Sequence, residues 1–245
     1  MIPKSHPRYE PLMIREKLVK GFKDGIVVPE GLIAHGRGEA FDYLIGEKTI
    51  PVAENAEKAA AAYLLKAKNP VISVNGNTAA LVKNDIVELS KIVPAKIEIN
   101  LFHRTDERVK KIGKMFKGMD VLGEKPDAKI TGVEHHRGLC CKSGIFSSDV
   151  VLVMLEDGDR AKALVDMKKT VIAVDLNPLS RTALTANVTV VDNVTRALKN
   201  IIKNCEILRN NRTEIDETIK NFDNRGNIDE ALKYISKRLE DLVVV

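Results

Sequence analysis

The sequence contains no tryptophan and has few aromatic residues of any kind. Phe and Tyr together make up 4% of its 245 residues. Proteins that bind single-stranded nucleic acids stack bases on aromatic side chains, so this scarcity argues against such a partner. The net charge is only +5, from 39 Lys and Arg against 34 Asp and Glu, and like charges form no long run. We therefore expect no nucleic-acid partner, and instead a site that handles small anions.

Cysteine is also scarce, with only Cys140, Cys141 and Cys205. An odd number that includes an adjacent pair excludes a disulfide framework, and no zinc-ligand spacing is present. No stretch approaches the roughly 18 apolar residues of a membrane helix. The first residues also lack a signal-peptide core. We expect reduced, partly buried thiols in a cytoplasmic protein with no membrane partner.

Short apolar runs rich in β-branched residues alternate with helical patterns through the middle of the sequence. The expected strands are residues 70–74, 96–101, 149–154, 170–176 and 188–191. These runs are continuously apolar, which is typical of parallel strands that are buried on both faces. We predict an α/β fold, a Rossmann-like doubly wound and mostly parallel sheet with extra N-terminal and C-terminal helices.

Helical patterns surround and connect these strands. The expected helices are residues 5–23 (regular from Pro11), 52–68, 78–91, 105–116, 160–168 and 193–203, and two more in a charged tail that breaks at 223–227. The glycine-rich residues 31–46 are expected to form a loop and a short helix. The predicted parts are a helical segment (1–69) packed on the core or on a dimer partner, a nucleotide-binding core (70–204) and C-terminal helices (205–245).

Polar residues follow four of the expected strands. They include Asn75 and Asn77 after the first strand, Arg104 after the second and Arg160 after the third. Ligands of open α/β sheets bind at the carboxyl ends of the strands. Turn-forming residues would also serve plain loops, so the recurrence at four ends is what favours a ligand site.

The most informative of these ends is Asp175-Leu176-Asn177-Pro178, followed by Arg181 and Thr182. A carboxylate there can accept hydrogen bonds from ribose hydroxyls or an adenine amino group. The arginine offers a fork for phosphate, and the threonine offers a hydroxyl. An Asx-turn after the strand explains the residues equally well, and spacing alone does not decide between the two.

Arg37 stands between two glycines in His35-Gly36-Arg37-Gly38-Glu39. Glycine lets the backbone approach an anion, and arginine can pair with the anion through two hydrogen bonds. Phe41 occupies the position of the third glycine of a dinucleotide fingerprint, and no phosphate-loop motif with lysine is present. The stretch indicates an anion site but excludes a classical NAD fingerprint and a P-loop enzyme.

Two carboxylates on one turn, Asp157 and Asp159, could hold Mg²⁺, although acidic glycine turns are common without metal. Arg137, after two histidines, could face an anionic substrate or cap a loop. No nucleophile signature is present, so covalent catalysis by a side chain is not expected. No residue stands out as catalytic.

Several distinctive blocks of sequence are spread from Ile2 to Leu198, namely IPKSHPRYEPL, REKLVKGF, GLIAHGRGEAFDYLIGE, PVISVNGNTAAL, NLFHRT, VVLVMLEDGDR, VIAVDLNPLSRTA and TVVDNVTRAL. Together these blocks resemble the archaeal phosphopantothenate synthetases, also called 4-phosphopantoate–β-alanine ligases. They stand in the family's order and cover most of the sequence, so the resemblance is highly specific.

The resemblance implies a homodimer that condenses 4-phosphopantoate with β-alanine and cleaves ATP to AMP and pyrophosphate, through a phosphopantoyl adenylate. Mg²⁺ is expected to neutralise phosphate charge. The ATP contacts that it implies are Arg15, Arg37, Asp175, Leu176, Asn177, Arg181, Thr182, Asn193 and Val194. For the other two substrates, position alone suggests Asn75, Asn77, Arg104, Arg137 and Arg160.

Two other functions fit the same scaffold. One is another ATP-dependent adenylating enzyme, and the other is a regulatory module that binds a nucleotide without turnover. A sensor would not need the HGRGE and EDGDR segments beside DLNP. Release of AMP in the presence of ATP and both substrates would separate these alternatives.

Overall fold

A computed structural model describes residues 2–243 and shows a six-stranded parallel sheet in the order β3-β2-β1-β6-β7-β8. The strands are β1 (Pro70–Val74), β2 (Lys96–Ile99), β3 (Val121–Leu122), β6 (Val150–Met154), β7 (Thr170–Val174) and β8 (Val188–Val190). This is the doubly wound order, in which the chain reverses its direction across the sheet between β1 and β6. The predicted Rossmann-like α/β fold is confirmed.

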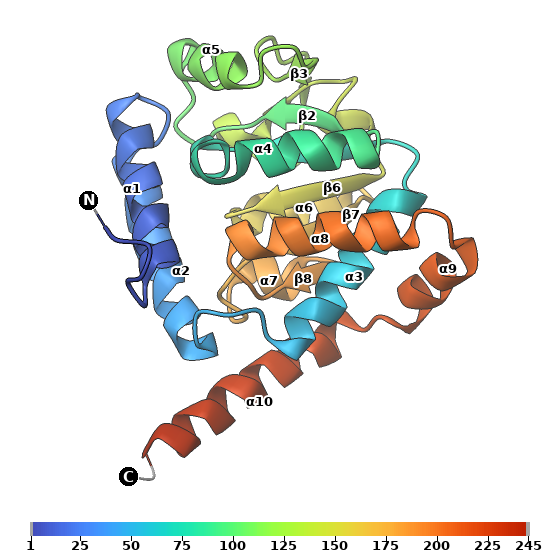
Figure 1. Ribbon diagram of the computed structural model, residues 1–245. Helices are drawn as coiled ribbons and strands as arrows, with labels where there is room; N and C mark the ends of the chain where they lie inside the picture. The colour runs from blue at the N-terminus through green and yellow to red at the C-terminus, as the bar shows by residue number, and fades with distance from the viewer. Residues whose placement is uncertain (1, 244–245) are drawn as a thin grey trace.

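Helices cover both faces of the sheet (Figure 1). One face carries α3 (Pro51–Lys66), α4 (Gly76–Ile92) and α8 (Val194–Leu208), and the other carries α6 (Gly158–Asp166) and α7 (Arg181–Thr185).

Successive strand residues point to opposite faces of this sheet. In β6, Leu152 packs in the cluster with α3, α4 and α8, whereas Val151 and Val153 pack in the cluster with α6. Because both faces are covered, both sets of positions are apolar. This explains why the strands read as continuous apolar runs.

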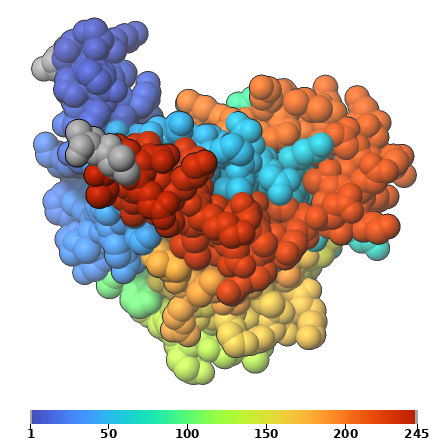
Figure 2. All heavy atoms as spheres, turned by 90° about the horizontal axis from the view of Figure 1, so that it is seen from below, coloured from blue at the N-terminus to red at the C-terminus, as the bar shows by residue number. Residues whose placement is uncertain are grey.

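The remaining elements lie at the edges of this core. They are α1 (Tyr9–Lys23), α2 (Pro29–Ile45), α5 (Asp106–Met115), the antiparallel pair β4 (Ala128–Lys129) and β5 (Leu139–Cys140), the 3-10 turns η1 (His136–Gly138) and η2 (Ile145–Ser147), α9 (Arg212–Asn221) and α10 (Asn224–Val243). Figure 2 shows α10 lying across the underside of the molecule, where it packs against α2 and α3. Among residues 2–243, no helix is long and apolar enough to cross a membrane.

The prediction of a loop within residues 31–46 is wrong, because this segment forms most of the continuous helix α2 and its C-cap. Pro29 occupies the first turn, where its missing N–H costs nothing, and Gly46 ends the helix in a left-handed conformation with φ 87°. Each internal glycine costs a helix about 1 kcal/mol relative to alanine. Packing offsets this cost, since Ile45 and neighbouring apolar residues of α2 lie in a buried cluster with Leu176 and Ile235.

Two other predictions from the sequence, the free thiols and the helical tail, are confirmed. All three cysteines are free and buried, and the charged tail forms two helices. The break between those helices falls just before Asn224, slightly earlier than expected. Strands β3, β4 and β5 were not predicted, because two-residue strands leave no periodic pattern. The division into three parts stays a prediction, and α3 already shares the main apolar cluster with α4 and α8.

Candidate active site

Helix α2 runs along the carboxyl edge of the sheet and contacts the loops that follow three of its strands (Figure 1). After β1, Asn77 Nδ2 donates to the Gly31 carbonyl at 2.7 Å. After β7, Leu176 lies beside Gly38, 3.8 Å from where a Cβ would be. After β8, Asn193 Nδ2 donates to Asp42 at 3.0 Å. The helix therefore covers the edge where a doubly wound sheet binds its ligands.

A cavity of about 280 Å³ lies between α2 and the switch point of the sheet. Its walls come from α2 and its N-cap, from the segments after β1, β2 and β6, and from two arginines. The lining residues are Val28, Glu30, Gly31, Ala34, Asn75, Gly76, Asn77, Leu101, Phe102, His103, Arg108, Arg137, Leu155 and Asp157. Apolar walls with a few convergent polar groups are typical of small-molecule sites.

Two predicted substrate residues, Asn75 and Asn77, line this cavity and also hold its walls together. Asn75 Oδ1 caps α4 by accepting the Thr78 N–H at 3.0 Å, and its Nδ2 donates to the Met154 carbonyl at 2.8 Å. This amide therefore ties the end of β1 to the end of β6. The next residue, Leu155, has φ 55°, a left-handed conformation that is unusual for a residue with a side chain. Such strain clusters at functional sites.

Beneath the cavity, the arginines Arg137 and Arg160 pair with one buried carboxylate, that of Glu156. Burial alone would raise the pKa of Glu156, but the charges of the two arginines outweigh burial and hold the pKa below its ordinary value. Arg160 also donates to Ser73 Oγ at 3.1 Å and is completely buried. This placement does not favour the substrate role suggested for Arg160, because its guanidinium neutralises an internal charge. Arg137 does reach the cavity wall.

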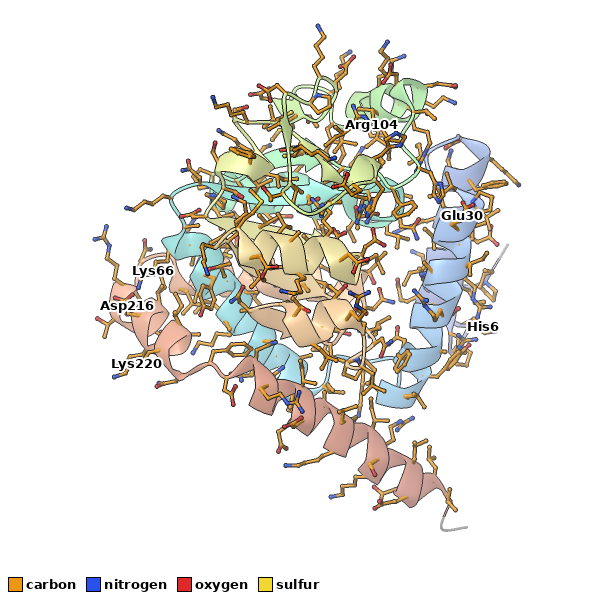
Figure 3. The ribbon with its side chains drawn as sticks, turned by 180° about the vertical axis from the view of Figure 1, so that it is seen from behind. His6, Glu30, Lys66, Arg104, Asp216 and Lys220 are labelled. Atoms are coloured by element: carbon orange, nitrogen blue, oxygen red, sulfur yellow. The ribbon has the colours of Figure 1, made fainter. Side chains whose placement is uncertain are left out.

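The predicted substrate residue Arg104 lies outside the cavity lining. Its Nη2 donates to the carbonyls of Gly123 at 2.7 Å and Glu124 at 3.1 Å, so it braces the end of β3. Figure 3 shows Arg104 on the same side of the molecule as Glu30, which does line the cavity. Arg108 was missed from the sequence, yet it lines the cavity and donates to the Ile26 carbonyl at 2.8 Å. Its only sequence signal is its place in the first turn of the helix after β2.

The loop after β7 carries the Asx-turn that the sequence left open as an alternative. Asp175 accepts the Asn177 N–H at 2.9 Å and the Ser180 hydroxyl at 2.5 Å, and Asn177 in turn accepts the Leu179 N–H at 2.9 Å. Burial raises the pKa of Asp175, although these hydrogen bonds and the charge of Arg37 oppose the rise. The turn and a nucleotide site are compatible, because the turn holds a buried carboxylate at the carboxyl end of β7.

Asn193 and Val194 stand at the N-terminus of α8. Asn193 caps the helix by accepting the Thr195 N–H at 3.1 Å, and Val194 is the first helical residue. Free backbone amides at a helix N-terminus favour phosphate and other anions. The two residues lie beside α2 through the contact of Asn193 with Asp42.

The other arginines that the resemblance implies lie farther out and are ion-paired. Arg15 on α1 pairs with Glu39 at 2.9 Å, and Arg181 pairs with Asp159 at 2.5 Å; the Arg15 side chain is 44% exposed and the Arg181 side chain 74%. Thr182 is buried instead, and its hydroxyl donates to the Glu156 carbonyl at 2.9 Å.

The structure does not support a metal site at Asp157 and Asp159. Asp157 faces Arg137 at 3.1 Å, and Asp159 faces Arg181. Within residues 2–243, no three acidic, histidine or cysteine side chains converge as metal ligands. Each carboxylate is already neutralised by an arginine, so this donor set does not fit Mg²⁺.

A doubly wound parallel sheet with a covered carboxyl edge, a cavity at its switch point and several arginines nearby is the arrangement of an enzyme that acts on phosphorylated or nucleotide ligands. Residues 52–238 match the family described as phosphopantothenate/pantothenate synthetase. The chain belongs to this family.

Its archaeal relatives cover nearly the whole length. A 4-phosphopantoate–beta-alanine ligase of Methanospirillum hungatei is 55% identical over 240 residues, which are 98% of each chain. The proteins of the same name from Methanosarcina mazei and Thermococcus kodakarensis are 51% and 50% identical over 98% of this chain, and over 96% and 94% of their own.

Proposed function

We propose that this protein condenses 4-phosphopantoate with β-alanine at the expense of ATP, a step in the synthesis of coenzyme A. The observation that carries the proposal is the similarity over 98% of the chain to the ligase of Methanospirillum hungatei, which is named for these two substrates. The site supports it, because the covered carboxyl edge holds a cavity at its switch point and carries polar residues after β7 and β8.

We assign ATP to the half of this edge that lies beyond β7 and β8. Asp175, Asn177 and Asn193 follow these strands, and the charge of Arg37 on α2 opposes the rise in the pKa of Asp175 that burial causes. The exposed guanidinium of Arg37 has no ion pair or hydrogen-bond partner within residues 2–243, so its five donors remain available for phosphate. The paired arginines Arg15 and Arg181 lie at the rim and would have to exchange their carboxylates for phosphate.

We assign 4-phosphopantoate and β-alanine to the cavity at the switch point. The amides of Asn75 and Asn77 and the guanidinium groups of Arg108 and Arg137 line this cavity among apolar residues, and the other polar lining residues are Glu30, His103 and Asp157. These groups suit a substrate with an apolar backbone, a carboxylate and a phosphate.

The proposed reaction has two steps. A carboxylate oxygen of 4-phosphopantoate attacks the α-phosphorus of ATP, the bond to the β-phosphate breaks, and pyrophosphate leaves. The unprotonated amine of β-alanine then attacks the acyl carbon, and AMP leaves with the transferred oxygen. Both steps need alignment and stabilisation of negative charge rather than a protein nucleophile. We propose that the guanidinium of Arg37 supplies the stabilising positive charge.

We further propose that Mg²⁺ enters with the phosphates of ATP, because Asp157 and Asp159 are engaged by arginines. No step above depends on the metal.

We also propose a cytoplasmic homodimer. Apolar side chains lie exposed on the two N-terminal helices, namely Val19 and Phe22 on α1 and Ile33 on α2, with Ile33 72% exposed. An interface between two copies that covers these apolar side chains would remove them from water, which favours association.

The test is incubation of the protein with ATP, 4-phosphopantoate and labelled β-alanine. We expect labelled 4'-phosphopantothenate together with AMP and pyrophosphate in equal amounts. Without β-alanine, labelled pyrophosphate should exchange into ATP only when 4-phosphopantoate is present. Binding of ATP with no turnover would support a regulatory module instead, and exchange with a different acid would indicate another adenylating enzyme.

A further inference from the structure

Four residues form a polar network that joins α2 to the start of α8. They are Asp42 on α2, Asp192 and Asn193 in the segment after β8, and Arg196 in the first turn of α8, and we name them the Arg196 cluster. Arg196 Nη2 donates to Asp42 at 2.6 Å, and its Nε donates to Asp192 at 2.8 Å. Asn193 Nδ2 completes the network by donating to Asp42 at 3.0 Å.

Burial and the number of hydrogen bonds restrict the side chains of the Arg196 cluster to one arrangement. Asp42 and Asp192 are 3% and 1% exposed, and one guanidinium forks between them. Thr49, which precedes α3, donates to the second oxygen of Asp192 at 2.6 Å. Short charge-assisted hydrogen bonds from a planar guanidinium fix distance and direction more tightly than a lysine could.

Both elements that the cluster joins carry proposed ATP contacts. Asp42 lies on the same helix as Arg37, little more than one turn away. Asn193 belongs both to the cluster and to the proposed nucleotide site. The cluster therefore sets the position of the Arg37 helix relative to the segment after β8.

We propose that Asp42 and Arg196 are positioning residues for ATP, which hold Arg37 and Asn193 at the separation that the nucleotide requires. This inference rests on the proposed function. Neither residue needs to touch the nucleotide, because the effect passes through α2 and the N-terminus of α8.

The experiment measures KM for ATP, KM for β-alanine and kcat in Asp42→Ala, Arg196→Ala, Arg196→Lys and Arg37→Ala, and in the double variant of Asp42 and Arg37. We expect Asp42→Ala to raise KM for ATP by about tenfold or more, since small misplacements of binding groups cost this much. KM for β-alanine should stay unchanged. Arg196→Lys keeps the charge but loses the fork, so it should raise KM for ATP less than Arg196→Ala.

The double variant tests whether Asp42 acts through Arg37. If it does, the effects of the two substitutions on ATP affinity should be clearly less than additive, because only the part that acts through Asn193 remains when Arg37 is absent. Glu214→Ala is the matched control, because it removes a carboxylate that links α9 to α3 through Lys58, far from α2 in Figure 1. It should leave KM for ATP unchanged.

Failure of this inference and failure of the proposed function give different results. Unchanged KM for ATP in a folded Asp42→Ala protein, or fully additive effects in the double variant, would overturn the inference. If Asp42→Ala does not fold, Asp42→Asn, which retains the shape of the side chain, is measured in its place under the same criteria. Absence of turnover in the unmodified protein would instead refute the proposed function.

Discussion

Glu57 on α3 is a buried carboxyl whose ionisation should weaken the fold as pH rises. Its side chain is 1% exposed, and Oε1 has no hydrogen-bond partner within residues 2–243. Burial, and then the negative charge of the neighbouring Asp192, raise the pKa of Glu57 to about 9 from an ordinary value of 4.5. At neutral pH the folded protein therefore holds a proton that the unfolded chain releases.

The sign of the effect follows from this difference in proton binding. The stability associated with the proton on Glu57 is fully present below about pH 4.5 and is lost as pH rises toward about 9. Within this window the free energy of unfolding should fall by about 1.4 kcal/mol per pH unit on account of this group. At pH 7 the loss relative to pH 4.5 amounts to about 3 kcal/mol.

The substitution Glu57→Gln removes the titration and replaces the O–H donor of the protonated carboxyl by an amide N–H that can still donate to Asp192. We expect the stability of the variant relative to the unmodified protein to increase steadily between about pH 5 and about pH 8. Urea unfolding at several pH values measures this difference, and Glu217→Gln, exposed on α9, controls for the removal of charge. A difference that does not change with pH in Glu57→Gln would refute the reasoning, because it would mean that Glu57 ionises in the folded protein as in the unfolded chain.

Three further predictions concern the site. Arg37→Ala should abolish most turnover without lowering the melting temperature, because Arg37 is exposed. Turnover and melting temperature are measured together, with Arg209→Ala at the C-cap of α8 as control, and normal turnover in Arg37→Ala would contradict the role of Arg37. Asn177→Ala should weaken ATP binding roughly tenfold or more, as loss of a hydrogen bond to a charged group does. Calorimetric titration with ATP measures this change, and an unchanged affinity would exclude Asn177 as an ATP contact. Glu156→Gln should cost about 3–5 kcal/mol in urea unfolding, because two buried guanidinium groups lose their counter-charge, and an unchanged midpoint would show that Glu156 is not their essential partner.

The strands could be predicted from the sequence because burial on both faces makes each of them a continuous apolar run. The run Pro70–Val74 is both the expected first strand and β1. Helix α2 could not be predicted in this way. Its glycines signal a loop locally, and the packing that keeps them helical comes from Asn77 and Leu176, which lie far away in the sequence.

The site was only partly predictable for the same reason. The strand-end rule located Asn75, Asn77 and Asp175 correctly at the carboxyl edge. It could not show that Glu156 would neutralise Arg160, nor that Asp159 would pair with Arg181. These pairings depend on side-chain directions that the sequence does not specify. The roles of the predicted ATP residues stay predictions.

The most direct measurement of the proposed chemistry follows an oxygen atom. 4-Phosphopantoate whose carboxylate carries a heavy oxygen isotope is incubated with the protein, ATP and β-alanine, and the products are examined by mass spectrometry. If the carboxylate attacks the α-phosphorus, the label passes to AMP, because AMP leaves with the transferred oxygen. Label found in inorganic phosphate, together with ADP, would show an acyl phosphate instead and would contradict the account.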